Sequence, residues 1–184
     1  EKLHNVTFDS SLSGSEAVAQ EIASLIKEKQ AKGLPCVLGL ATGSSPISVY
    51  NQLIRLHQEE GLSFKNVISF NLDEYFGLKP NDINSYHFFM HENLFDHIDV
   101  PAENINIPSG IIEQSQVRDY CKGYEKKIDD LGGLDFQLLG IGRTGHVGFN
   151  EPGSNINSQT RLVTLDHLTP VSYTHLRAHE TVDY

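Results

Sequence analysis

The sequence contains only two cysteines, Cys36 and Cys121, and they lie far apart in the chain. Two thiols in 184 residues do not make the disulfide framework of a small secreted domain, so we expect a reducing compartment. The N-terminal residues also lack the basic and then apolar pattern of a signal peptide. These features predict a cytoplasmic protein.

Basic residues are scarce: 14 Lys and Arg stand against 24 Asp and Glu, which gives a formal net charge of −10. This balance argues against nucleic acid or an anionic membrane as partner, since both require a basic surface. No apolar run approaches the roughly 20 residues of a membrane-spanning helix. A phosphorylated small molecule remains compatible, because backbone N–H groups and one or two local cations can hold a single anionic group.

Strand-like and helix-like segments alternate along the chain, without internal repeats or a low-complexity linker. Short apolar or extended segments predict strands at 6–8, 36–40, 67–72, 104–107, 136–139 and 161–165. Amphipathic segments between these strands predict helices. One of them begins with a capping box of Ser13 and Glu16, and others extend over 85–94 and 113–130. This order predicts an α/β fold with a mostly parallel sheet and helices on both faces, and ligands in such folds bind where the strands end.

Small residues follow the first long strand at 41–45, directly before Pro46. Gly43 permits a tight turn, and the hydroxyls of Thr42, Ser44 and Ser45 lie beside N–H groups at a helix N-terminus. This arrangement suits a phosphate, although it lacks the Gly-Lys-Ser/Thr ending of a Walker loop. An ordinary serine-rich helix cap explains the segment equally well.

Two adjacent carboxylates, Asp73 and Glu74, follow the second long strand. Neighbouring strand residues point to opposite faces, so the two should serve different purposes. One of them could enter a cleft and act as a general base whose pKa is raised by partial burial. Taken alone, a solvated strand end with Asp capping a turn explains the pair better.

The last strand exit, residues 139–152, contains four glycines in nine residues, which indicates a loop close to a ligand. His146 and Glu151 are its candidates for acid–base chemistry. Gly140, Gly142 and Gly145 also fit the dinucleotide-binding fingerprint. That interpretation fails on context, because the motif should open a long helix after the first strand, and this loop does neither.

Taken together, these segments resemble the glucosamine-6-phosphate deaminase/isomerase family, whose Rossmann-like fold 6-phosphogluconolactonases share. The resemblance covers roughly residues 3–169 and rests on four stretches: LGLATGSSPISVYNQL, FKNVISFNLDEYFGL, SYHFFMHENLFDHIDVPAENINIPSG and LLGIGRTGHVGFNEPGS. The Asn-Leu-Asp-Glu-Tyr and Gly-His-x-Gly-Phe-Asn-Glu-Pro segments point to the deaminase branch. The resemblance implies a three-layer fold and the conversion of glucosamine 6-phosphate and water to fructose 6-phosphate and ammonia.

The resemblance also implies roles for individual residues. Asp73 matches the base that moves a proton between C2 and C1 of the opened sugar, which passes through an enolamine. His146 matches the residue that assists ring opening, and Glu151 the carboxylate that works with it. Thr42, Gly43, Ser44 and Ser45 match the loop near the phosphate. No metal or organic cofactor is implied, and the sequence holds no Cys/His ligand cluster.

The chain departs from the family in three places. Thr144, a substrate-binding candidate, stands where many members carry Asp, and a hydroxyl cannot stabilise an imidazolium as a carboxylate does. The match ends near Pro170, so we divide the chain into a partial family domain, 1–169, and a non-family tail, 170–184, which reads as artefactual or disordered sequence. The family's later strands, with an Arg and a Lys for the phosphate, are absent, so we expect an unstable and inactive fragment.

Two other functions remain as alternatives: a 6-phosphogluconolactonase-like enzyme, and a non-catalytic module that binds a sugar phosphate. A binder has no need for three proton-handling groups, so Asp73, His146 and Glu151 argue against the module. The resemblance allows a homo-oligomer for the full-length parent and fixes neither oligomeric state nor allosteric control.

Overall fold

A parallel sheet forms the middle layer of the computed structural model, which describes residues 4–142 and 145–165. Its four strands lie in the order β3-β2-β1-β4, and each neighbouring pair is parallel. The strands are β1 (Cys36–Leu40), β2 (Val67–Asn71), β3 (Ile105–Asn106) and β4 (Phe136–Gln137). The predicted α/β fold with a mostly parallel sheet is therefore confirmed.

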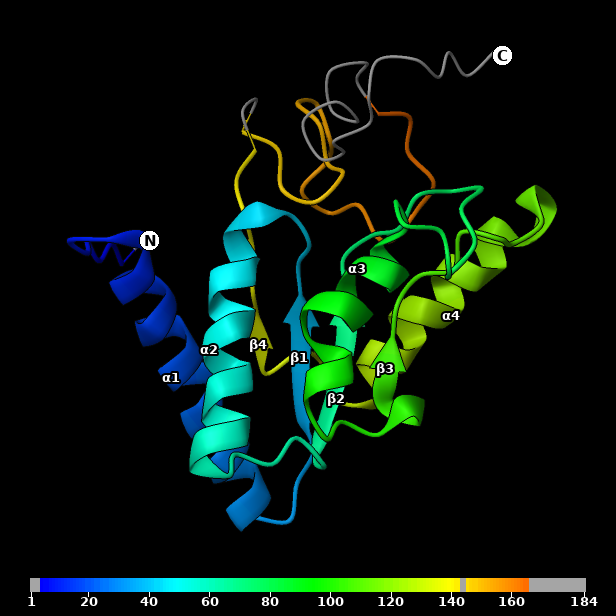
Figure 1. The fold of residues 1–184 in the computed structure, drawn as a ribbon. Helices are drawn as coiled ribbons and strands as arrows, with labels where there is room; N and C mark the ends of the chain where they lie inside the picture. The colour runs from blue at the N-terminus through cyan, green and yellow to red at the C-terminus, as the bar shows by residue number, and fades with distance from the viewer. Residues whose placement is uncertain (1–3, 143–144, 166–184) are drawn as a thin grey trace.

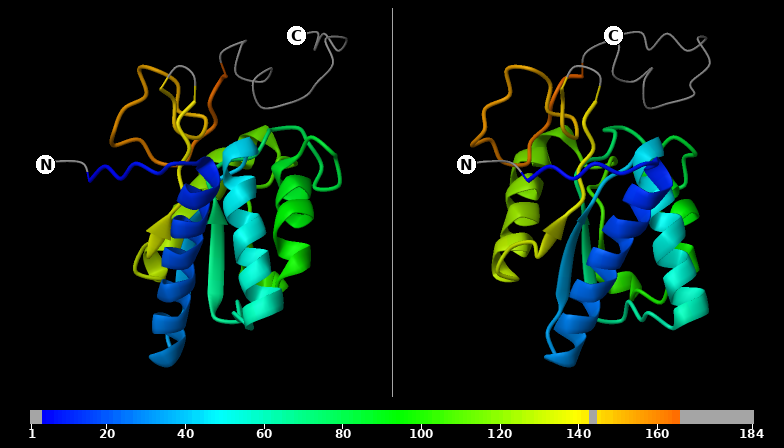
Figure 2. Two further views of the ribbon diagram at one scale, coloured as in Figure 1. Left: turned by 60° about the vertical axis from the view of Figure 1, so that its left-hand side comes forward. Right: turned by 90° about the vertical axis from the view of Figure 1, so that its left-hand side faces the viewer.

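Helices cover both faces of this sheet, as Figures 1 and 2 show. One face carries α1 (Ser11–Ala31), α2 (Ser44–Glu60) and α3 (Tyr86–Asn93), and the opposite face carries α4 (Val117–Asp130). Three 3-10 turns complete the described elements: η1 (Phe95–His97), η2 (Ala102–Asn104) and η3 (Gln114–Gln116). None of the helices in the described part of the chain is both long and apolar enough to cross a membrane.

The buried side chains of β1 divide between the two faces because successive strand residues point to opposite sides. Cys36, Leu38 and Leu40 join the larger hydrophobic cluster beneath α1, α2 and α3. Val37 joins Phe70 and Tyr124 in a smaller cluster beneath α4. All five residues of β1 are buried, as a strand covered on both faces requires.

The strands predicted over 67–72, 104–107 and 136–139 and the helix predicted over 85–94 are shorter in the structure, and three other predicted segments differ more. Residues 6–8 form no strand: Val6 is 71% exposed and pairs with nothing in a sheet. Residues 161–165 form no strand either, and the neighbouring Thr160 is instead fastened to α4 by hydrogen bonds to Glu125. The helix predicted over 113–130 begins at Val117, after η3.

The predicted capping box of the first helix is also wrong in its residues. Ser10 is the N-cap, in extended conformation, and its hydroxyl accepts a hydrogen bond from the Ser13 N–H. The Ser13 hydroxyl in turn accepts one from the Ser10 N–H at 3.2 Å. The box therefore closes between two serines, and Glu16 has no part in it.

The carboxyl ends of β1, β2 and β4 meet at the upper edge of the sheet in Figure 1. Backbone hydrogen bonds continue between neighbouring chains just past the strands, from Leu72 N–H to the Leu40 carbonyl and from Leu138 N–H to the Gly39 carbonyl. The three loops that carry the candidate residues therefore leave the sheet side by side.

Candidate active site

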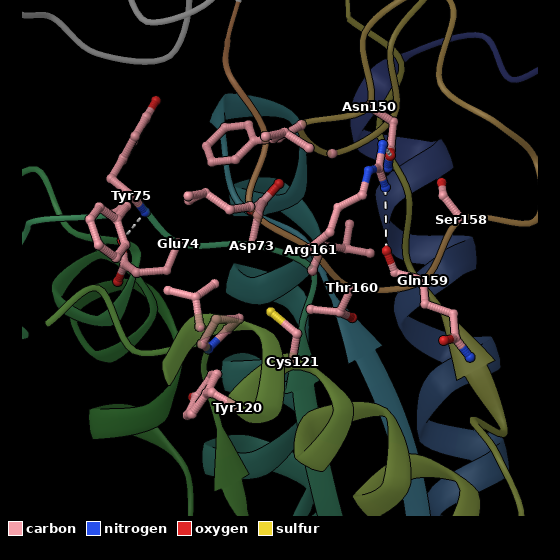
Figure 3. Close-up of a pocket in the computed structure, with 18 of the residues that line it drawn as sticks. Asp73, Glu74, Tyr75, Tyr120, Cys121, Asn150, Ser158, Gln159, Thr160 and Arg161 are labelled. Atoms are coloured by element: carbon pink, nitrogen blue, oxygen red, sulfur yellow. Dashed lines mark hydrogen bonds between the residues drawn. The ribbon is translucent and has the colours of Figure 1, made fainter. Parts of the chain in front are cut away.

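A cavity of about 320 Å³ opens at this upper edge, on the side of the sheet that α4 covers. Its walls come from the exit of β2, residues 108–112 after β3, α4 from Val117 to Glu125, and two stretches between residues 147 and 165. Ten of its lining residues are labelled in Figure 3: Asp73, Glu74, Tyr75, Tyr120, Cys121, Asn150, Ser158, Gln159, Thr160 and Arg161. Among the predicted site residues that the structure describes, Asp73 alone lines this cavity.

Asp73 lies just beyond the last residue of β2. Burial raises the pKa of its carboxyl group to about 7, and the neighbouring charge of Glu74 contributes in the same direction. At neutral pH the group is therefore divided between its protonated and ionised forms, which suits both taking up and returning a proton.

Glu74 points in a different direction from Asp73 (Figure 3). Its carboxylate accepts hydrogen bonds from the backbone N–H groups of Tyr75, Tyr86 and His87 at 2.8 to 2.9 Å. Burial raises the pKa of Glu74, while these backbone hydrogen bonds act in the opposite direction. Both carboxylates thus line the cavity, but only Glu74 is hydrogen-bonded to the start of α3.

The glycine-rich loop places His146 against its own backbone. The Gly142 N–H donates to the His146 carbonyl at 2.8 Å, and the imidazole packs where a side chain at position 142 would lie. His146 is only 4% exposed, and its Nδ1 lies 3.7 Å from Oε2 of Glu151. The structure therefore brings His146 and Glu151 together, although neither lines the cavity.

Gly148 brings the same loop close to Asp73. Its φ of +57° favours glycine, and a Cβ there would lie 3.2 Å from Oδ2 of Asp73. A side chain at position 148 would therefore be disfavoured both by the backbone conformation and by the closeness of the Asp73 carboxylate.

The loop after β1 begins α2 without a side-chain cap. Gly43 occupies the N-cap position, with φ +102°, and the first turn of α2 receives no hydrogen bond from a capping side chain. The buried Tyr50 hydroxyl donates to the Ala41 carbonyl and so fixes the start of the loop. Thr42 lies beside the hydroxyl of Tyr86, whereas none of the four residues Thr42, Gly43, Ser44 and Ser45 lines the cavity.

Three aromatic rings connect the separate parts of the site, and the sequence analysis did not identify them. Tyr75, Tyr86 and Phe149 lie with ring centroids 5.0 to 5.7 Å apart. They come from the exit of β2, the first turn of α3 and the glycine-rich loop. Tyr75 follows Asp-Glu directly and Phe149 follows Gly148, so their proximity to the predicted residues was the available signal.

The stretch before residue 165 forms the remaining wall, and it too went unpredicted. Glu125 on α4 accepts hydrogen bonds from both the backbone N–H and the hydroxyl of Thr160, at 2.6 and 2.7 Å. Arg161 donates to Asn150 at 3.0 Å and to Ser154 at 3.3 Å. These bonds hold the stretch against both α4 and the glycine-rich loop.

Two predictions from the sequence concern residues that the structure does not describe. Thr144, a substrate-binding candidate, and the predicted boundary at 169 lie outside the described residues, so both stay predictions. Within residues 4–142 and 145–165, no cluster of three or more His, Cys, Asp or Glu side chains is arranged to hold a metal ion.

Comparison with known protein families and with individual proteins points to one family. The family model for glucosamine-6-phosphate isomerases/6-phosphogluconolactonase matches residues 10–174. Glucosamine-6-phosphate deaminase 1 of Bacillus subtilis (strain 168) is 50% identical over 155 residues, which are 84% of this chain and 62% of that protein.

Two solved structures extend the comparison to the fold. A monomeric glucosamine-6-phosphate deaminase aligns with a TM-score of 0.82 and 48% identity, over 88% of this chain and 65% of the other. The 6-phosphogluconolactonase from Plasmodium vivax aligns with a TM-score of 0.67 and 26% identity, over 83% and 53%. The chain therefore spans less than two thirds of the length of each of these three relatives.

Proposed function

The chain belongs to the family of glucosamine-6-phosphate isomerases and 6-phosphogluconolactonases, and we propose that within this family it carries the deaminase chemistry. The proposed reaction takes glucosamine 6-phosphate and water to fructose 6-phosphate and ammonia. The observation that carries the proposal is Asp73, a carboxyl group in a cavity at the end of β2 with a pKa of about 7.

Asp73 is the proposed base. In the opened sugar, its carboxylate removes the proton from C2, and the electrons of that C–H bond form the C1–C2 double bond of an enolamine. The π electrons of the C1 carbonyl move at the same time to its oxygen, which takes up a proton and becomes a hydroxyl group. The protonated carboxyl group then returns the proton to C1, which leaves an imine at C2 that water hydrolyses to the ketone and ammonia. A group that both accepts and returns a proton works best with a pKa near the working pH, as Asp73 has.

His146 and Glu151 are proposed to open the sugar ring. Ring opening requires one proton to leave the C1 hydroxyl and another to reach the ring oxygen, and an imidazole can carry both transfers near neutral pH. Glu151, with its carboxylate 3.7 Å from Nδ1, would orient the ring and stabilise its charged form. The nearly complete burial of His146 limits the positions that the ring can adopt.

Thr42, Gly43, Ser44 and Ser45 are proposed to bind near the phosphate group. The first-turn N–H groups of α2 and the adjacent hydroxyls offer donors to an anion, and the N-terminus of a helix favours negative charge. Thr42 lies beside Tyr86, whose pKa Asp73 influences, so the loop and the base are close to a common neighbour. Thr144 stays a further candidate for substrate contact. The proposal makes a small sugar phosphate the partner, needs no cofactor, and suits a cytoplasmic enzyme.

A comparison of two substrates tests the deaminase proposal. We would assay the 184-residue chain beside a version that continues, after the matched region, with the C-terminal part of the B. subtilis relative. The expected result for the extended version is ammonia from glucosamine 6-phosphate and no acid from 6-phosphogluconolactone. Acid release without ammonia would assign the lactonase reaction instead, and a folded protein that turns over neither substrate would favour a binding module.

A further inference from the structure

Glu74 lines the cavity, but both oxygens of its carboxylate already accept hydrogen bonds from the backbone. Its Oε1 accepts hydrogen bonds from the N–H groups of Tyr75 and Tyr86 at 2.8 and 2.9 Å. Its Oε2 accepts one from the N–H of His87 at 2.9 Å. Three short hydrogen bonds from the backbone leave this side chain one orientation.

These bonds complete the N-terminus of α3. The first N–H groups of a helix have no partners within it, and here they are shared between two side chains. Glu74 takes those of the first two residues, Tyr86 and His87, and the Ser85 hydroxyl takes that of the third, Phe88, at 3.0 Å. Ser85 is a local cap, whereas Glu74 comes from the exit of β2 and therefore fastens the helix to the segment that carries Asp73.

The surroundings of the two carboxylates set how strongly they interact. Burial is the largest influence on Glu74 and raises its pKa, and the charge of Asp82 acts in the same direction. The helix N-terminus and the three N–H donors oppose this rise by favouring the ionised form. The titratable groups facing the cavity from α4 and the last stretch are Tyr120, Cys121, Glu125 and Arg161. Tyr86 on α3 and Tyr124 on α4 also lie near Asp73.

Arg161 is the single cation among the cavity's lining residues in the described part of the chain, and its guanidinium is exposed and bonded to Asn150 and Ser154. The influences that raise the pKa of Asp73 are burial first and Glu74 second. Glu74 is thus the charged group that, after burial, raises the pKa of Asp73.

We propose that Glu74 is a positioning residue, which fastens α3 to the exit of β2 and holds a fixed negative charge beside Asp73 without touching the substrate. A role for Glu74 in proton transfer rests on the proposed function, since that role assumes that Asp73 is the base. The electrostatic coupling between Glu74 and Asp73 does not depend on the proposed function, and it can be measured in the absence of any substrate.

The test is a titration of Asp73 by NMR, with ¹³C-labelled aspartate carboxyl groups in the full 184-residue chain. In Glu74→Gln the shape is kept and the charge is lost, so the midpoint for Asp73 should fall. It should fall only part of the way from about 7 toward the ordinary value of about 4, because burial, the larger cause, remains. An unchanged midpoint overturns the proposal.

Ser85→Ala is the matched control, because it removes the other cap of the same helix without changing any charge. Both variants should lower the melting temperature, while Ser85→Ala should leave the Asp73 midpoint in place. An equal shift in both variants would mean that a loosened helix, rather than the charge of Glu74, moves the midpoint, and this too would overturn the proposal.

A reciprocal measurement covers the case in which Glu74→Gln fails to fold. Coupling between two titrating groups acts equally in both directions. In Asp73→Asn the midpoint of Glu74, followed with ¹³C-labelled glutamate, should therefore fall, and an unchanged midpoint contradicts the proposal. Failure of the deaminase assay would leave both titrations unaffected, so the two proposals fail separately.

Discussion

The substitution Gly142→Ala tests how the glycine-rich loop holds His146. A Cβ at position 142 would lie 2.0 Å from Nε2 and 2.1 Å from Cε1 of the imidazole. Ordinary contact begins at 3.4 Å, so the ring would have to move by about 1.4 Å. His146 is only 4% exposed and has little room to do so. Overpacking of this kind costs about 1–3 kcal/mol.

Gly140→Ala is the control, two residues earlier in the same loop. Neither glycine has a positive φ, and a Cβ at position 140 meets nothing within 4 Å. Both substitutions restrict the unfolded chain equally, so the difference between them isolates the clash with His146. In urea unfolding followed by circular dichroism, we expect Gly142→Ala to be less stable than Gly140→Ala by about 1–3 kcal/mol. Equal midpoints would refute the packing of His146 against the backbone of Gly142.

Two further predictions concern the hydrogen bonds of single side chains, those of Tyr50 and Asp135. Tyr50→Phe should cost about 1–3 kcal/mol in unfolding free energy, because the Ala41 carbonyl loses its buried donor, and an unchanged urea midpoint would contradict this bond. Burial opposes ionisation of Asp135, but its bonds to Lys29 and to the Val37 N–H outweigh burial and hold its pKa below the ordinary value. A lowered pKa stabilises the fold above about pH 4, and this contribution disappears as the pH falls through the folded-state pKa. Asp135→Asn should therefore destabilise the chain at pH 7 by at most about 1 kcal/mol, because solvent screens this pair, and should lose this effect in strong acid; a deficit independent of pH would count against the charged pair.

The sheet was predictable because its strands are short apolar runs with clear ends. The run Cys36–Leu40 forms a strand with these bounds, and the run from Val67 ends one residue earlier than predicted. Since parallel strands end at one edge, their order along the chain was enough to predict that Asp73, His146 and the loop after β1 gather there.

Contacts between distant residues were not predictable in the same way. Residues 161–165 have the composition of a strand, but Thr160 is held by Glu125, 35 positions away in the sequence, and no pattern in either segment shows this. The capping box forms between Ser10 and Ser13 rather than the predicted pair, because serines at 10, 11, 13 and 15 surround the start of the helix and the local pattern fits more than one of them. Strand alternation predicted different purposes for Asp73 and Glu74, but β2 ends at Asn71, before both residues. Their different surroundings come instead from the three N–H donors that hold Glu74, which required the structure.

The most direct test of the central claim is ammonia release from glucosamine 6-phosphate by the extended chain, with Asp73 and with Asp73→Asn. The amide has nearly the shape of the carboxyl group but cannot accept the C2 proton. The account predicts that the extended chain releases ammonia and that Asp73→Asn abolishes the release while the protein remains folded. Undiminished ammonia release from the Asp73→Asn protein would show that another group is the base and would contradict the account.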